Sequence, residues 1–298
     1  MIQRNNNLSV LPFYENVDEQ NHRKPYAYGE VFPLYTPLGC VPPFQIIIPH
    51  TTASIQSVML RRVDETTWFH IKSELDATGL KKLYYTAGYD VICYPALVPY
   101  NITAKEGRYE MKVVLSDHTE YYSDYFTAVA DVSGMIQLQW YDEQDLVMDG
   151  CRIVYSDYTN QDGGQYFKNT LWLPTLLGKP EYEFTEDGEE RDGYFFPEKM
   201  ISEKRYKCTF LAPEYLCDVL RFVRMSDVVF VRDNYNNVYR CDTFLITPKW
   251  QEQGDLASVE LEFTCDTVAK KVGRGIIRGN LGDFNDDYNN DFDITINN

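Results

Sequence analysis

The sequence predicts a mainly β protein, with an immunoglobulin-like β-sandwich followed by an antiparallel β-barrel or sheet that carries one flanking α-helix. Three observations support this class. Short apolar runs separated by turn residues fill 31–130, one amphipathic helical pattern stands at 213–225, and the run 257–266 alternates between apolar and polar residues. Strands and helices do not alternate along the chain, as they would in a nucleotide-binding α/β domain.

The predicted organisation has four parts. Residues 1–30 form an extended polar arm, 31–130 the immunoglobulin-like sandwich, 131–272 the second β domain, and 273–298 an acidic polar tail. We expect the arm to pack on its own domain or to reach a neighbouring subunit. The tail is too polar to build a core of its own, so we expect it to be disordered or ordered against another chain.

In the first domain, runs bounded by turn residues predict strands at 44–48, 55–63, 89–94, 109–115 and 120–129. Residues 68–75 fit both the helical and the strand period, and we predict a strand there. After the boundary near 131–134, a strand is expected to point Ile136, Leu138 and Trp140 inward. Short strands at this spacing, without a clear helix, favour a sandwich.

The second domain contains the longest continuous pattern in the chain. We expect strands at 204–211, 228–233, 238–247 and 257–266. The helix at 213–225 has Pro213 at its first position, where a missing N–H costs nothing. Its buried stripe is Leu216, Val219, Leu220 and Val223, at the spacing of one helix face. A turn at 234–237 predicts a hairpin, because Asn tolerates positive φ.

Composition narrows the function classes. With 28 Lys and Arg against 45 Asp and Glu, the net charge of −17 disfavours binding to nucleic acid and to anionic membranes. The 24 Tyr, 16 Phe and 4 Trp residues suit both β-strands and large interfaces. Seven scattered cysteines without a C-x-x-C pair indicate a reducing compartment. No secretory signal or membrane-length apolar run is visible, so we expect a soluble protein made in a cytoplasm.

Few patterns point to catalysis or cofactors. The four histidines lie in separate segments, and no metal-ligand pair, nucleophile elbow, phosphate loop or dinucleotide fingerprint occurs. The acidic residues of 181–192 are predicted to form an exposed loop, and the alternative is a carboxylate pair that cleaves glycosidic bonds. The alternating Asp and Asn of 283–293 resemble calcium ligands but lack the Gly and Glu of an EF-hand. We therefore expect no cofactor, with weak calcium binding by the tail as the alternative.

Several motifs bring a family to mind. They are Gly107–Tyr109, Tyr121–Phe126, Gly178–Tyr182, Glu189–Lys199, Ser202–Lys204, Leu211–Asp218, Ile246–Trp250 and Gly254–Ala257. This set resembles structural proteins of phages and prophages of gut Bacteroides-type bacteria, over about Pro12 to Val272. Separately, the strand-helix-hairpin-strand order of 201–266 is similar to the tail-tube-like domain of siphophage distal tail and baseplate hub proteins. The tail after Gly279 matches neither.

The resemblance implies a non-enzymatic virion protein of the tail or baseplate, assembled in the bacterial host cytoplasm. Its partners would be further copies of itself, in a ring of six or three, and other phage tail proteins. The candidate interface residues are Arg191, Tyr194, Phe195, Phe196, Trp250, Gln251, Asp283 and Phe284. A carbohydrate-binding adhesin is the alternative, with aromatic platforms at Tyr84-Tyr85, Tyr121-Tyr122 or Tyr194–Phe196.

Overall fold

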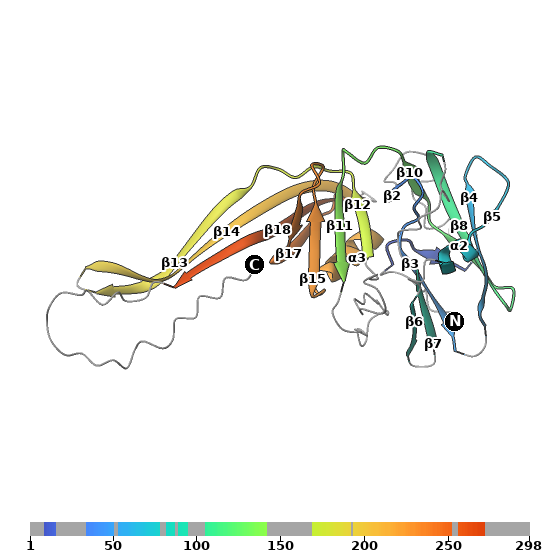
Figure 1. Cartoon of the computed structure of the whole chain (residues 1–298), viewed down its shortest axis with the longest axis horizontal. Helices are drawn as coiled ribbons and strands as arrows, with labels where there is room; N and C mark the ends of the chain where they lie inside the picture. The colour runs from blue at the N-terminus through green and yellow to red at the C-terminus, as the bar shows by residue number, and fades with distance from the viewer. Residues whose placement is uncertain are drawn as a thin grey trace. The chain divides into compact units, whose positions relative to one another are not determined.

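Strands dominate the computed structural model of the chain, which confirms the mainly β prediction (Figure 1). The structure describes residues 9–15, 34–50, 53–77, 82–86, 89–94, 105–141, 169–191, 193–251 and 256–271. The chain divides into two units. One comprises 1–183 and 202–268, and the other comprises 184–201 and 269–298.

The largest sheet has 11 strands and draws on most of the chain. Its main path runs β1-β9-β8-β10-β2-β12-β11-β15-β16, and β4 and β5 are attached through β8. The strands are β1 (Phe13–Tyr14), β2 (Leu34–Pro37), β4 (Ile55–Arg62), β5 (Phe69–His70), β8 (Gly107–Leu115), β9 (Glu120–Ser123), β10 (Phe126–Val129), β11 (Ile136–Tyr141), β12 (Asn169–Leu173), β15 (Val228–Arg232) and β16 (Val238–Arg240).

Strand β2 joins the two halves of this sheet. It pairs in parallel with β10, where Phe126 lies opposite Leu34, and antiparallel with β12, where Trp172 lies opposite Tyr35. As predicted, Ile136, Leu138 and Trp140 of β11 point into the core. The sheet therefore continues across the expected boundary near residue 131, and separate domains at 31–130 and 131–272 stay a prediction.

A second sheet has three strands in the order β3-β7-β6, with β3 at Phe44–Pro49, β7 at Tyr89–Tyr94 and β6 at Lys82–Thr86. The ring of Phe44 stacks on Tyr94 with centroids 4.8 Å apart and lies 5.2 Å from Phe13. These contacts tie β3 to the first strand of the large sheet. The strands predicted at 44–48 and 89–94 are confirmed.

The strand predicted at 68–75 is wrong for most of its length. Only Phe69–His70 is a strand, and Lys72–Ala77 forms helix α2, with Leu75 fully buried. The salt bridge between Lys72 and Asp76 spans one helical turn. Such i,i+4 pairs favour a helix over a strand, which explains why the period-two pattern of this segment does not produce a strand.

The third sheet has four strands in the order β13-β14-β18-β17. They are β13 (Glu181–Arg191), β14 (Tyr194–Pro213), β18 (Leu256–Lys271) and β17 (Thr243–Lys249). Its buried face is formed by Tyr206, Cys208, Phe210, Ala212, Phe244, Ala257, Val259, Leu261, Phe263 and Cys265. The alternation predicted for 257–266 is confirmed, except that Thr264 on the polar side is also buried.

The acidic segment 181–191 is a strand and not the predicted loop. Its first residues alternate between acidic and aromatic side chains, which is the period-two pattern of a strand. The loop was predicted because so many of the residues in this segment are acidic. At the turn into β14, Gly193 has a positive φ of 79°, a conformation that glycine adopts without strain.

Helix α3 (Glu214–Val223) covers the predicted stripe, and all four stripe residues are buried. The helix packs on β17. It is shorter than the predicted 213–225. Pro213 still has extended backbone, with ψ at 165°, and lies just before the first helical residue, and Arg224 caps the other end.

The strand predicted at 238–247 is divided between two sheets. The N–H of Cys241 donates to the carbonyl of Val229 in the large sheet, whereas the N–H of Asp242 donates to Thr264 in the four-stranded sheet. The chain therefore changes sheets at these two residues. The turn before β16 is confirmed, and its Asn236 has φ of 65°.

Substitutions at Asn236 test this left-handed turn. We expect Asn236→Ala to lower the free energy of unfolding by about 1 kcal/mol, because the alanine Cβ disfavours positive φ. Asn236→Gly should stay within a few tenths of a kcal/mol of wild type. Urea unfolding followed by fluorescence measures both, and a glycine variant as unstable as the alanine variant would contradict the backbone explanation.

Candidate interaction surface

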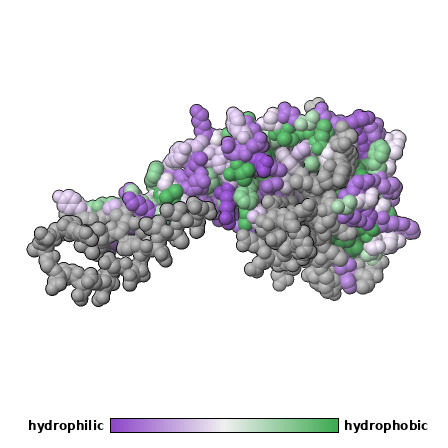
Figure 2. Space-filling model, in the orientation of Figure 1, coloured by the Kyte–Doolittle hydropathy of each residue, from purple (hydrophilic) through white to green (hydrophobic). Residues whose placement is uncertain are grey.

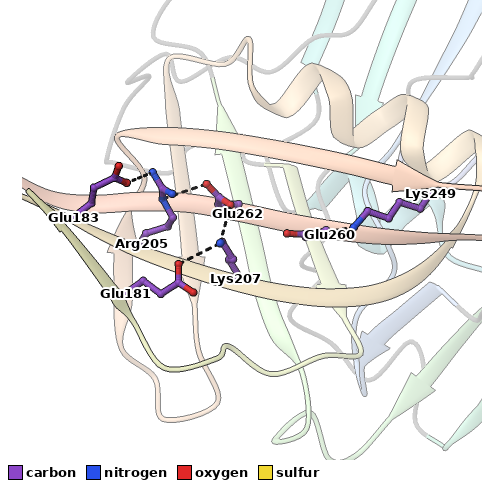
Figure 3. Close-up of polar contacts among 7 residues, drawn as sticks. All are labelled: Glu181, Glu183, Arg205, Lys207, Lys249, Glu260 and Glu262. Carbon is purple, nitrogen blue, oxygen red and sulfur yellow. Dashed lines mark hydrogen bonds and ion pairs between the residues drawn. The ribbon is translucent and has the colours of Figure 1, made fainter. Parts of the chain in front are cut away.

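The outer face of the four-stranded sheet carries a network of ion pairs (Figure 3). Arg205 of β14 contacts Glu183 of β13 at 2.5 Å and Glu262 of β18 at 3.2 Å. Lys207 contacts Glu181 at 3.2 Å and Glu262 at 3.6 Å. These residues link three neighbouring strands through opposite charges, which stabilise cross-strand pairs.

The sign of the charge alternates from strand to strand in this face. The side chains that pair are acidic on β13, basic on β14 and acidic on β18, and Lys249 on β17 then contacts Glu260 at 2.8 Å. We call these seven side chains the charge ladder: Glu181, Glu183, Arg205, Lys207, Glu260, Glu262 and Lys249. It arises because one face of each strand is buried and the polar residues must share the other.

Hydrogen bonds within the charge ladder shift two pKa values. The hydrogen bond to Glu181 is the main cause that raises the pKa of Lys207, and the hydrogen bond from Lys249 lowers the pKa of Glu260. Both side chains are partly exposed to solvent, where water and salt screen an ion pair and it contributes little to stability. The charge ladder therefore sets the electrostatic pattern of this face more than the stability of the fold.

The acidic side chains of β13 are exposed. They are Glu181, Glu183, Glu186, Asp187, Glu189 and Glu190, and Asp192 lies outside the described residues. A glycosidase needs one carboxyl whose burial raises its pKa above the usual range. Because these described carboxylates face water, the strand gives the glycan-cleaving alternative no support.

Large aromatic side chains lie exposed on the hairpin formed by β13 and β14. Tyr194 is 71% exposed and Phe195 51%, and both are among the predicted interface candidates. Tyr182 and Phe184 of β13 are 66% and 70% exposed and are not among the predicted candidates. The alternation of these two aromatic residues with Glu181 and Glu183 is the sequence pattern that could have identified them, because it is typical of a strand. In Figure 2, hydrophobic and hydrophilic residues lie interspersed over the face shown.

The remaining candidates fall in several places. Arg191 ends β13 and Phe196 lies in β14, but their side chains are not among those described. Trp250, 47% exposed, and the exposed Gln251 directly follow β17 in the first unit. Asp283 and Phe284 lie outside the described residues, as does the calcium-like segment 283–293. Of the described candidates, Arg191, Tyr194, Phe195 and Phe196 therefore lie on the strands β13 and β14 in one unit, and Trp250 and Gln251 follow β17 in the other.

The aromatic pairs of the adhesin alternative are only partly described. Tyr121 is buried, and Tyr122 lies edge-on to Trp68 with ring centroids 6.3 Å apart. The guanidinium of Arg61 lies 4.6 Å from the centre of the Trp68 ring, and the ammonium of Lys112 lies 5.2 Å from it. These cations already contact the ring that a sugar would need. Tyr84 and Tyr85 lie in β6, and their side chains are not described.

Burial makes several thiols poor nucleophiles. It raises the pKa of Cys208 to about 12 and the pKa values of Cys217 and Cys265 to about 11, and it also raises the pKa of Cys241. Within the described part of the chain all six cysteines are free thiols.

We predict that iodoacetamide at pH 8 alkylates Cys208, Cys217, Cys241 and Cys265 far more slowly in the folded protein than in urea. Peptide mapping would measure this, and equal rates would contradict their burial.

Two other features are absent from the residues that the structure describes. Within them no group of three His, Cys, Asp or Glu residues is arranged to hold a metal ion, and no helix is long and apolar enough to cross a membrane. No known protein-family model matches the chain, and no curated protein is detectably similar to it in sequence.

Proposed function

We propose that this chain is a non-enzymatic structural component of a virion, in the tail or baseplate of a Bacteroides-type phage. It would assemble in the host cytoplasm through head-to-tail contacts into a ring of six or three copies and bind other tail proteins. An immunoglobulin-like N-terminal sandwich and a tail-module-like C-terminal domain with one flanking helix belong to the same proposal.

The observation that carries the proposal is the β13–β14 hairpin. Four aromatic side chains on it are more than half exposed, at Tyr182, Phe184, Tyr194 and Phe195. Exposed aromatic groups of this size mark interaction surfaces, and aromatic residues are enriched in protein interfaces. Charged side chains on the same strands keep the surface soluble before assembly and restrict which partner can fit.

Light scattering of the purified full-length protein tests the proposal. We expect a defined assembly of three or six copies at micromolar concentration. The double substitution Tyr182→Ser and Phe184→Ser should shift the mass toward the monomer, whereas Val63→Ser and Phe69→Ser, also at exposed positions, should not. A wild-type monomer that stays monomeric over a wide concentration range, with and without residues 273–298, would argue against ring assembly.

The second candidate is a carbohydrate-binding adhesin. Its aromatic platform would be Trp68 and Tyr122, with the Tyr122 hydroxyl donating to Glu120, and a sugar would have to displace Arg61 and Lys112 from the Trp68 ring. The adhesin would bind sugars as a monomer and lose binding in Trp68→Ala. A glycan array with the wild-type chain and this variant separates the two candidates.

A further inference from the structure

We propose that the outer face of the strand pair β15–β16 binds the face of β13 that carries Phe184, Glu186 and Glu190, from a second copy of this chain. This inference rests on the proposed self-assembly and names the two surfaces that would join neighbouring copies. The receiving surface, which we call the arginine face, comprises Gln137, Gln139, Phe230, Arg232, Val238 and Arg240. Each of these residues is at least partly exposed.

Antiparallel pairing places the arginine face on one side of the large sheet. Arg232 of β15 lies opposite Val238 of β16, and Phe230 lies opposite Arg240. The two glutamines of β11 continue both rows on the other side of β15. Residues directly opposite each other on paired strands point to the same face of a sheet, and the residue between them on β15, Val231, is buried in the core.

The two arginines have no acidic partner among the described residues, although the chain contains 45 Asp and Glu. The carboxylates that follow them most closely in the sequence bond elsewhere. Asp233 accepts hydrogen bonds within its own turn, and Asp242 accepts the N–H of Thr267 at 3.0 Å. Each guanidinium has five N–H donors, and without a carboxylate they stay available to another molecule.

One face of β13 offers both kinds of group that a guanidinium binds. Alternate residues of a strand share a face, so Phe184, Glu186 and Glu190 lie on the same one. The ring of Phe184 is 70% exposed, and both carboxylates are exposed and form no ion pair in the described part of the chain. Arginine binds a carboxylate through two parallel hydrogen bonds and an aromatic ring through its face. The charge ladder uses the other set of alternate residues, so this contact leaves its ion pairs intact.

The spacing of the two surfaces also matches. Arg232 and Arg240 are diagonal neighbours on paired strands, and such positions lie about 7–8 Å apart. Phe184 and Glu186 are two residues apart along a strand, which is a separation of about 7 Å. One guanidinium can therefore bind the carboxylate of Glu186 while the other covers the ring of Phe184. Val238, 52% exposed, adds an apolar contact between them.

The charge of the chain favours a second copy over nucleic acid as the partner. With a net charge of −17, the surface around the arginine face repels a long polyanion, whereas a strand that brings two carboxylates contacts only the arginine face. Each copy then has one donor surface and one receiving surface. Two different surfaces form a head-to-tail interface, which closes into a ring or extends as a filament.

Charge reversal in the full-length chain tests the receiving surface. The acceptor variant carries Arg232→Glu and Arg240→Glu, and the matched control carries Lys105→Glu and Lys179→Glu at other exposed positions. At 50 mM salt, we expect sedimentation to show association about tenfold weaker for the acceptor variant and within about twofold of wild type for the control. Unchanged association of the acceptor variant, or equal weakening in the control, would overturn the proposal. Retention on DNA that only the acceptor variant loses, with its mass unchanged, would assign the arginines to nucleic acid instead.

Exchanging the charges tests whether the two surfaces meet each other. The donor variant carries Glu186→Arg and Glu190→Arg and should associate as weakly as the acceptor variant. A chain with all four substitutions presents acids in place of the arginines and arginines in place of the acids, so its association should return to within about threefold of wild type. Because misfolding cannot produce this recovery, a chain that stays dissociated would overturn the pairing of these surfaces.

Crosslinking tests whether the contact joins separate copies. Arg240→Lys supplies an amine that a carbodiimide couples to a carboxylate in contact with it. In an equal mixture of ¹⁴N-labelled and ¹⁵N-labelled chains, we expect links from position 240 to Glu186 or Glu190 that combine both isotopes. Links confined to one isotope would overturn the contact between copies. Assemblies that every substitution leaves intact would refute this contact and leave the virion proposal standing, whereas a monomeric wild-type chain would overturn both.

Discussion

Replacing Phe263 with alanine is expected to lower the free energy of unfolding by about 3–5 kcal/mol, the range observed when a buried phenylalanine is truncated. Phe263 is fully buried in β18, where its ring stacks on Tyr206 with centroids 5.4 Å apart and lies 6.1 Å from Tyr239. These two partners come from different sheets, so the substitution would open a cavity where the sheets meet.

Chemical denaturation monitored by circular dichroism measures this loss. The control is Phe195→Ala, since that ring is 51% exposed and its removal should change stability by less than about 0.5 kcal/mol. A loss below about 1 kcal/mol for Phe263→Ala would contradict the position of this ring in the core.

Replacing Asp233 with alanine should cost about 2–3 kcal/mol, because hydrogen bonds to a charged group contribute more than neutral ones. This carboxylate accepts the N–H groups of Tyr235 and Asn237 at 2.9 and 2.8 Å. It also accepts the side-chain amide of Asn237 at 2.8 Å and the hydroxyl of Tyr239 at 3.1 Å. The residue is 9% exposed and fixes the turn between β15 and β16.

The same residue makes stability depend on pH. Burial alone would raise the pKa of Asp233, but the hydrogen bonds from Asn237, Tyr235 and Tyr239 outweigh it and lower the pKa below its usual value. A carboxyl with a lowered pKa stabilises the fold above its unfolded pKa, and this contribution is lost as the pH falls below about 4. Asp233→Asn removes the titrating group, so its stability should fall less between pH 5 and pH 3 than that of wild type. Unfolding curves at both pH values test this, and equal losses would contradict the assignment.

Local patterns with a clear period were predicted well from the sequence. The stripe of α3 and the alternation of β18 specify which side chains are buried, and the structure confirms both. The turn at Asn236 was predictable because few residue types adopt positive φ. In each case the residues that specify the local structure lie close together in the sequence.

Features that depend on distant residues were missed. The acidic character of 181–191 suggested a loop, because its counter-charges Arg205 and Lys207 lie more than twenty residues away on β14. The change of sheet at Cys241 and Asp242 depends on hydrogen bonds to Val229 and Thr264, and no pattern among neighbouring residues predicts it. Tyr182 and Phe184 were not predicted as site residues, because no strand was expected at 181–191. Their exposure on the surface of a strand could therefore not be inferred.

The position of β2 has a consequence for how the polypeptide reaches its native state during synthesis. Its four residues pair with β10, which is made about ninety residues later, and Tyr35 also pairs with Trp172 of β12, which is made more than a hundred and thirty residues later. Contacts this distant along the chain slow folding, because a long loop must close before they form. A nascent chain that has emerged only as far as residue 141 holds β2 with one side still unpaired, and such an edge invites association with other nascent chains. Chaperones that bind emerging polypeptides should therefore engage this protein until residue 173 has left the ribosome.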